Sequence, residues 1–512
     1  MKNIIISMFF AVQSLLCFCQ KEDNIWLSGY HESILYDTNI HHYYAVNKID
    51  FNTPTPTVTL DSAITINFDA SAISFSDSTG HILFYSNGIE IRNKWDEIIP
   101  NSRKMNDGWV NNVYNPSIVS RGYPDLEAIM ALPIPDSQSD FLFFQCFADS
   151  TQGITSITYP KVLTTYLSMS DNNGHGKVHY RDSVLLQDVV SPFFTACKHA
   201  NGKDWWILVG KQNSNCYYRI LLTKDGAKIL PDLTCIGELI PWDDYGVASF
   251  SPDGSRYAVL NAMKGMMLYD FDRCEGTFTN SYFYPIPSII DSGWGPTGAV
   301  FSPNSRFLYG TLGFCLLQFD TWQIDPLADP DTIARYDGFE DPIGSGYSSG
   351  QIGPDGKIYI ASTGNEGNYS VIDSPDLKGR ACHFRPHGLS LPALQFGPPI
   401  HPNYRLGRLA GSACDTLTGL TNINVGKKGV LAYPNPSADF ITVNYETIDR
   451  SVINDIHIEV IDVTGKVIFA QETVKNSVSQ KIDIKMLDQG LYFITLKDEN
   501  YNSVGSCKII KE

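Results

Sequence analysis

A repeat with a period of 51 residues runs through the middle of the sequence and constrains its fold more than any other feature. Three copies begin at Phe250, Phe301 and Ile352, so they lie 51 residues apart. Each copy opens with a short turn of the type Ser-Pro-Asp-Gly and continues into a run of apolar and aromatic residues. A unit of this length cannot bury its apolar surface alone, so the repeat predicts a fold of stacked, similar units.

Further copies extend the repeat toward the N-terminus. One lies at 199–208, one at 75–85 and a weaker one at 136–144. In each copy the turn joins two short strands, and a second hairpin follows, as at 265–272 and 314–320. Four short antiparallel strands in about 50 residues are typical of one blade of a β-propeller.

The predicted fold class is therefore all-β, a β-propeller followed by a small immunoglobulin-like β-sandwich. Six copies of the repeat lie between about residues 70 and 375. Strands expected near 26–51 and 389–396 would complete a seventh blade by joining the two ends of the propeller. Seven blades are predicted, and six or eight are the alternatives. The composition agrees, since 40 Gly, 28 Pro and 12% aromatic residues favour many short strands and tight turns.

The N-terminus has the pattern of a signal peptide, predicted over residues 1–19. Lys2 supplies a positive charge, and the 15 residues from Ile4 to Phe18 are almost entirely apolar, which is too short to span a bilayer. Cleavage is predicted between Cys19 and Gln20, with lipidation of a cysteine as the alternative. No later stretch contains 18 uncharged apolar residues, so no membrane span is expected.

Charge and cysteine usage exclude several classes of partner. The formal net charge is −17 without a basic patch, and such a surface repels phosphate backbones, so nucleic-acid binding is not expected. Nine cysteines follow the predicted signal peptide, and none has the spacing of a zinc site. An exported chain can form disulfides, but an odd number leaves at least one thiol unpaired and the spacing assigns no pairs.

Residues 72–88 and 198–206 and the Ser-Pro-Asp-Gly repeats are framework motifs of the expected blades. Through them the stretch from Ile25 to about Gly411 resembles exported propeller proteins of the WD-repeat-like or quinoprotein-like type. These proteins are widespread in Gram-negative bacteria that use the type IX secretion system. The resemblance implies the fold and a surface location, without a particular reaction, and the propeller is expected over 20–411.

The sequence changes character after Gly411. Residues 412–432 are rich in Thr, Asn, Gly and Lys, which is typical of a linker. Six or seven short strands are expected within 433–512, separated by turns such as those at 463–466 and 488–490. So many short strands in a segment of this size predict an immunoglobulin-like sandwich.

Four elements occur in a fixed order in this C-terminal segment. They are Tyr433-Pro434-Asn435-Pro436, then 460–467 with Gly465, then 487–496 with Gly490, Leu491 and Tyr492, and last the basic Lys511 beside the terminus. Together they resemble the type A C-terminal sorting domain of type IX secretion cargo. The resemblance implies recognition by the secretion machinery at the outer membrane and removal in or near the linker. The body would then be released or attached at the outer cell surface. A sandwich that serves only for adhesion or spacing is the alternative.

A propeller commonly binds ligands at the mouth of its central channel, so candidate residues must lie on loops. His41 and His42 are neighbours that would point to opposite faces of a strand, which disfavours a shared metal ion. Asp243 and Asp244 are paired carboxylates, but charged turns are common. Residues 198–199 are interpreted as a hydrogen-bonded turn. The sequence therefore predicts no catalytic, cofactor-binding or metal-binding residue.

Three classes of function are compatible with these observations. A binding or interaction module for an unknown extracellular ligand is favoured, and an enzyme is not expected. The alternatives are a hydrolase or lactonase-like enzyme built on the propeller, and a structural component of the envelope. Converging acidic and histidine side chains at the channel mouth would favour the enzyme, an apolar or aromatic mouth would favour ligand binding, and a plugged channel would favour the structural role.

Overall fold

The computed structural model describes residues 20–31, 35–37, 42–68, 70–115, 122–125, 127–150, 157–240, 246–262, 264–285, 297–312, 314–341, 346–362, 366–415, 430–445, 456–462, 466–473, 477–498 and 503–511. The chain divides into two compact units, residues 1–416 and 417–512. The predicted signal peptide therefore lies outside the described residues, and Gln20 is the first residue described.

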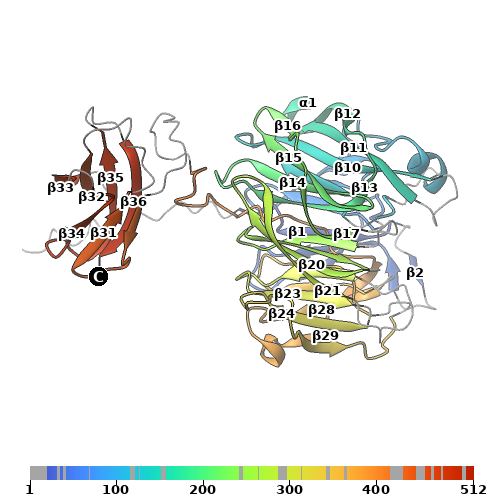
Figure 1. Ribbon diagram of the computed structural model, residues 1–512. Coiled ribbons are helices and arrows are strands. Elements are labelled where there is room, and N and C mark those ends of the chain that lie inside the picture. The colour runs from blue at the N-terminus through green and yellow to red at the C-terminus, as the bar shows by residue number, and fades with distance from the viewer. Residues whose placement is uncertain are drawn as a thin grey trace, which may run out of the picture. The chain divides into compact units, whose positions relative to one another are not determined.

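The first unit consists of antiparallel sheets that follow one another along the chain (Figure 1). Within the described residues there are seven of these sheets. The first sheet contains β1 (Ile25–Gly29), β4 (Val46–Asp50) and β5 (Thr57–Asp61), and the second contains β6 (Ile73–Ser76), β7 (Ile82–Ser86) and β8 (Ile91–Asn93). The third sheet contains β9 (Ile129–Pro133), β10 (Asp140–Ser150), β11 (Ile157–Ser168) and β12 (Lys177–Leu186). The fourth sheet contains β13 (Val190–Lys198), β14 (Trp205–Lys211), β15 (Ser214–Thr223), β16 (Gly226–Ile229) and β17 (Thr234–Ile240).

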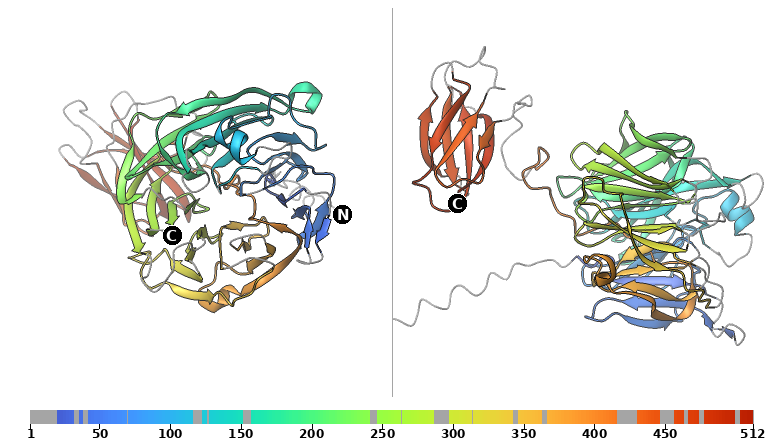
Figure 2. Two further views of the ribbon diagram at one scale, coloured as in Figure 1. Left: turned by 90° about the vertical axis from the view of Figure 1, so that its right-hand side faces the viewer. Right: turned by 60° about the horizontal axis from the view of Figure 1, so that its bottom comes forward.

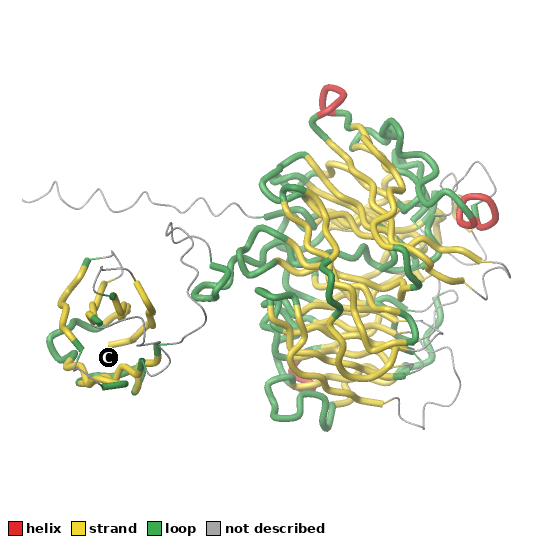
Figure 3. The backbone as a smooth tube through the Cα atoms, turned by 45° about the horizontal axis from the view of Figure 1, so that its top comes forward, coloured by secondary structure: helices red, strands yellow, loops and turns green. Residues whose placement is uncertain are grey.

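The remaining three sheets complete the unit. The fifth sheet contains β18 (Gly246–Phe250), β19 (Arg256–Asn261), β20 (Gly265–Asp272) and β21 (Thr277–Pro285). The sixth contains β22 (Thr297–Phe301), β23 (Phe307–Leu312), β24 (Cys315–Asp320) and β25 (Asp331–Arg335). The seventh contains β26 (Gly350–Ile352), β27 (Ile358–Ile360), β28 (Glu366–Ile372) and β29 (Phe384–Gln395), and it is extended by β3 (His42–Tyr44) and β2 (Leu35–Asp37). Helical turns are short and peripheral: α1 (Asp171–Gly174), η1 (Val110–Tyr114) and η2 (Gly379–Cys382) (Figure 3). No helix in the described ranges is long and apolar enough to cross a membrane.

Each sheet shares a buried core with the next one, and the last shares a core with the first. Tyr217 of β15 meets Tyr257 of β19 with ring centroids 5.9 Å apart, which joins two successive sheets. Trp26 of β1 meets Tyr359 of β27 at 5.5 Å and joins the last sheet to the first. The sheets therefore close into a ring, seen along its axis in the left view of Figure 2. This is the arrangement of a β-propeller.

The repeated turns lie between the first and second strands of successive sheets. Asp253 accepts a hydrogen bond from the backbone of Ser255 at 2.9 Å, and Asn304 accepts one from Arg306 at 3.0 Å. A side chain that bonds the backbone two residues on is the Asx turn that such residues favour. Gly254 has a φ of +72° and Ser305 one of 65°, so both turns need the left-handed region at the same point.

The N-terminal strands differ from the expectation that they complete one blade together with 389–396. β1, β4 and β5 form a sheet of their own, and β29 is the partner of β28 in the preceding sheet. The hairpin β2–β3 meets β29 through a parallel bridge between Tyr43 and Ala393. The expected pairing is therefore present only in part, because β2 and β3 join the sheet of β29 while β1, β4 and β5 pair among themselves.

The second unit contains two antiparallel sheets that share one core. One sheet has β30 (Leu431–Tyr433), β31 (Phe440–Asn444) and β34 (Ser479–Asp483), and the other has β33 (Val467–Glu472), β32 (His457–Asp462), β35 (Gly490–Lys497) and β36 (Ser503–Lys511). Ile441 and Val443 of β31 pack in the same cluster as Ile458 and Val460 of β32. Ile441 and Val443 alternate along β31 with more exposed residues, as expected for a sheet with one buried face.

Candidate functional site

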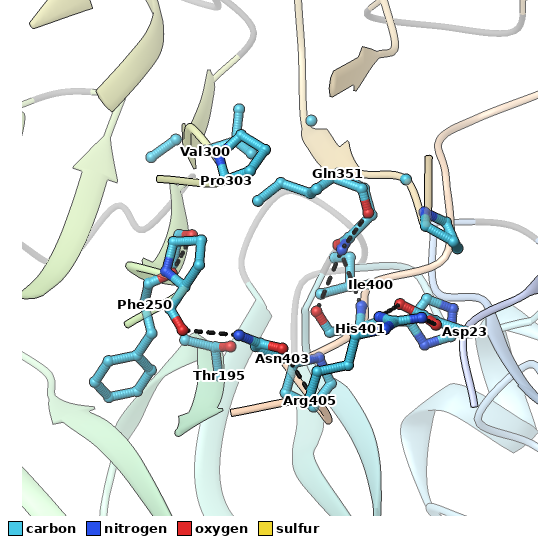
Figure 4. A pocket seen from close by; sticks show the side chains of 18 of the residues that line it. Asp23, Thr195, Phe250, Val300, Pro303, Gln351, Ile400, His401, Asn403 and Arg405 are labelled. Atoms are coloured by element: carbon cyan, nitrogen blue, oxygen red, sulfur yellow. Dashed lines mark hydrogen bonds and ion pairs between the residues drawn. The ribbon is translucent and has the colours of Figure 1, made fainter. Parts of the chain in front are cut away.

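A cavity of about 280 Å³ lies at the centre of the propeller. Its walls include Thr195 of β13, Phe250 of β18, Val300 of β22 and Gln351 of β26, which come from four successive sheets (Figure 4). The strands β13, β18 and β22 are the first of their sheets in chain order, and β26 is the first of the run β26–β29. The cavity is thus a product of ring closure, because no single sheet contributes more than one side of it.

The remaining wall is formed by a segment without regular structure, residues 396–415, which we call the strap. His401 is held by the amide of Gln351, which accepts from the His401 backbone N–H at 3.2 Å and donates to its carbonyl at 3.3 Å. Asn403 donates to the carbonyl of Pro252 at 2.7 Å. The strap therefore passes from the β26–β29 sheet to the turn that follows β18, across the channel (Figure 4).

One ion pair fixes the strap to the N-terminal end of the propeller. Arg405 donates from its two terminal nitrogens to the two carboxylate oxygens of Asp23, at 2.7 and 2.5 Å. Asp23 is only 6% exposed. This fork geometry binds a carboxylate firmly, and it leaves neither charge uncompensated at the cavity wall.

Glu127 is a buried carboxyl at the same cavity. It precedes β9, is 7% exposed, and accepts a hydrogen bond of 2.6 Å from the backbone N–H of Ala248 in β18. Burial raises the pKa of Glu127 to about 8, and the bond from Ala248 opposes this only in part. The carboxyl is therefore protonated at neutral pH and can donate a hydrogen bond. Its φ of 54° places a non-glycine residue in the left-handed region, which costs about 1 kcal/mol or more.

His401 is the second buried titratable group of the cavity. It is 8% exposed, and its Nε2 has no hydrogen-bond partner within the described part of the chain. Burial lowers the pKa of His401 to about 4, although nearby Asp23 acts in the opposite direction. The ring is thus neutral at neutral pH, and its Nε2 is a buried polar atom without a partner in the wall of the cavity. Buried polar atoms normally have partners, so a free one at a cavity favours a binding role.

The chemistry of the cavity is that of an uncharged site. Glu127 and His401 are neutral near pH 7, Asp23 is paired with Arg405, and Phe250 and Ile400 add apolar surface. Such a lining accepts a neutral ligand with hydrogen-bonding groups, whereas an isolated ion would lose its hydration without a counter-charge. Among the described residues, no three or more His, Cys, Asp or Glu side chains are grouped to hold a metal ion.

The residues considered from the sequence lie elsewhere. His41, Asp243 and Asp244 are outside the described residues. His199 contacts the carbonyl of Cys274 through Nε2 at 3.1 Å and accepts from Asn201 through Nδ1 at 3.0 Å, which is a turn interaction of the predicted kind. Sequence reasoning missed Glu127 and His401, because neither belongs to a motif and they are brought together only by ring closure.

The structure links parts of the predicted sorting motif within the second unit. Asn435 donates to the carbonyl of Lys508 at 2.7 Å and accepts from the backbone of Ile510 at 2.8 Å. Gly490 is the register partner of Lys511. The first element is therefore bonded to the last strand, β36, and the third element pairs with Lys511 at the end of that strand. The other members are placed as follows: Tyr433 ends β30, Pro434 and Pro436 flank Asn435, Leu491 and Tyr492 lie in β35, and Gly465 is outside the described residues.

Comparison with known proteins assigns the C-terminal unit. Residues 431–512 match the family of secretion system C-terminal sorting domains. No curated protein matches the chain. The chain thus carries a type IX secretion system C-terminal sorting domain behind a β-propeller, and it is secreted or attached at the outer cell surface.

Several solved structures are similar to this chain at low identity. A putative 6-phosphogluconolactonase from Bacteroides uniformis ATCC 8492 is 12% identical, with 69% of this chain and 92% of that chain covered and a TM-score of 0.40. A quinoprotein alcohol dehydrogenase-like protein from Bacteroides thetaiotaomicron VPI-5482 is 11% identical, with 75% and 78% covered and a TM-score of 0.35. Likenesses at this level assign no activity to this chain.

Proposed function

We propose that this protein is type IX secretion cargo that delivers a seven-bladed propeller to the cell exterior, where the channel cavity binds a small uncharged ligand. The observation that carries the proposal is the pair of neutral, buried groups at the cavity, Glu127 and the unpartnered Nε2 of His401. The seven sheets with shared cores support the blade number. The strap crosses the channel yet leaves a cavity of about 280 Å³, which favours ligand binding over a purely structural role.

A fragment screen by ligand-observed NMR tests this proposal. The library holds equal numbers of neutral, anionic and cationic fragments of similar size. We expect neutral fragments with donor and acceptor groups to dominate the hits, and Ser249→Trp, which fills the cavity from β18, to abolish them. Val184→Trp at an exposed position of β12 is the matched control and should keep them. Hits that are mainly charged, or that survive Ser249→Trp, would contradict the proposed site.

A hydrolase is the second candidate function. A protonated carboxyl and a neutral imidazole at one cavity, here Glu127 and His401, are the acid and base that opening an ester or lactone requires. Release of acid from a neutral lactone probe, lost in both Glu127→Gln and His401→Asn, would select this function over simple binding.

For the ends of the chain we propose signal-peptide cleavage between Cys19 and Gln20, a linker over 412–432 and an immunoglobulin-like sorting domain over 433–512. The two sheets with a common core support the sandwich. The secretion machinery would recognise the edge where Asn435 meets the last strand. Removal of the domain in or near the linker would leave the propeller as the mature protein.

Deletion of residues 433–512 is expected to trap the propeller in the periplasm. Fractionation and immunoblotting of cell-surface and periplasmic material measure this. Asn435→Ala is expected to reduce surface delivery, because it removes both hydrogen bonds to the last strand. Gln480→Ala, a change in the other sheet of the same unit, is its control. Unchanged surface display of the deletion variant would overturn the sorting role.

A further inference from the structure

The strap is part of the candidate site as well as its cover. Ile400, His401, Asn403 and Arg405 line the cavity together with the inner strands (Figure 4). One wall of the cavity therefore exists only while the strap is seated. Whatever holds the strap also determines whether the site is complete.

The middle of the strap is anchored in the propeller core. Tyr404 is 4% exposed and packs against Phe75 and Trp205, with ring centroids 5.5 and 5.9 Å away. Arg273 donates to the carbonyl of Gly407 at 2.6 Å. These contacts place the strap against three sheets, those of β6, β14 and β20.

The end of the strap is held by a covalent bond. Cys414 forms a disulfide with Cys274, which follows β20, across a sequence separation of 140 residues. Both cysteines are partly exposed, so a thiol reagent can reach them. The second disulfide, Cys216–Cys235, joins β15 to β17 within one sheet at a separation of 19 residues and does not involve the strap.

A free thiol lies beneath the strap. Cys197 is 3% exposed and belongs to a core against which Leu406 packs. Gly254 lies between them: a Cβ at Gly254 would come within 2.6 Å of the Cys197 sulfur and within 2.9 Å of Leu406. Burial raises the pKa of the Cys197 thiol to about 12, so it is unreactive while covered.

We propose that the Cys274–Cys414 disulfide locks the strap in place, so that the channel cavity becomes a complete binding site only in the oxidised protein. That the disulfide fixes the strap does not depend on the proposed function. Its consequence for ligand binding does rest on the proposed function. The locking step is thiol–disulfide exchange with a disulfide-bearing oxidant. One cysteine thiolate attacks the oxidant's disulfide and expels one thiolate, and the other cysteine then displaces the second. The cysteines lose two electrons and two protons, and the oxidant is reduced to a dithiol.

Alkylation of Cys197 reports the position of the strap. We expect iodoacetamide to label Cys197 at least about tenfold faster in Cys274→Ser/Cys414→Ser than in the wild type, as measured by peptide mass spectrometry. The matched control Cys216→Ser/Cys235→Ser lacks the other disulfide and should label at the wild-type rate. Cys146, fully buried in another core, should stay protected in all three proteins. Equal Cys197 rates in the two double variants would overturn the lock.

Labelling of Cys146 would show that Cys274→Ser/Cys414→Ser had misfolded. A second measurement tests the lock in that case, because it does not use this variant. Of the two disulfides found among the described residues, the Cys216→Ser/Cys235→Ser protein retains Cys274–Cys414, which dithiothreitol then reduces. Faster labelling of Cys197 after this reduction supports the lock, and an unchanged rate overturns it. The fragment hits are then measured in the same samples. Hits that persist after the lock opens would contradict its role in completing the site. If reduction exposes Cys197 but the protein binds no fragments even before reduction, the proposed function is contradicted and the disulfide lock is not.

Discussion

Replacing Glu127 by Gln is expected to stabilise the propeller at neutral and alkaline pH, with the gain disappearing in acid. Burial holds the pKa of Glu127 at about 8 in the folded protein, against an ordinary value of 4.5. The unfolded chain therefore releases its proton between pH 4.5 and about 8 while the folded protein keeps it. Stability falls as the pH rises through this window, by about 3 kcal/mol by pH 7. Gln does not ionise, so it removes this loss.

Urea unfolding of the wild type and the variant at several pH values measures the effect. His401→Asn is a control of opposite sign, because burial lowers the pKa of His401 to about 4 from 6.5. The unfolded chain binds this proton as the pH falls from 6.5 to 4, so wild-type stability is lost in that direction and the Asn variant avoids the loss. Glu366, whose pKa burial raises to about 7, remains in every protein and cancels in the comparison. A Glu127→Gln difference that does not change with pH would contradict the assignment.

Removing the Cys274–Cys414 disulfide is expected to destabilise the propeller more than removing Cys216–Cys235. A cross-link lowers the entropy of the unfolded chain by an amount that grows with the loop that it closes, and the separations are 140 and 19 residues. The chain-entropy relation gives losses of about 5 kcal/mol for the long loop and about 3 kcal/mol for the short one. Urea unfolding of the two double serine variants at one pH tests this order. A larger loss for Cys216→Ser/Cys235→Ser would show that the strap bridge adds little to stability.

The repeat predicted the propeller because its signals are local. Asp253 and Asn304 bond their own turns, and the strands beside them alternate within a few residues, so each hairpin can be recognised from its own sequence. The pairing of the strands at the two ends of the propeller was harder to predict from the sequence. Whether 26–51 pairs with itself or with 389–396 depends on which strands lie side by side after ring closure, and both arrangements satisfy the local pattern.

The candidate site was beyond sequence reasoning for the same reason. Glu127 precedes β9 and reaches Ala248, 121 residues later, while His401 lies in a segment without regular structure. Their unusual pKa values arise from burial, which is a property of the closed ring and not of their neighbours in sequence. The pairing of Cys274 with Cys414 likewise requires the path of the strap.

The contacts that join the two ends of the propeller also determine how much of the chain must be present before folding can finish. Asn47 exchanges two hydrogen bonds with the backbone of Ala393, 346 residues away, and Asp23 pairs with Arg405 over 382 residues. A chain that enters the periplasm N-terminus first must present β1 and β4 long before their last partners arrive. Contacts of such sequence separation form slowly, and unpaired strand edges invite aggregation in the meantime. Under the proposed export by an N-terminal signal peptide, we therefore expect the early sheets to remain incomplete until the strap has crossed the inner membrane.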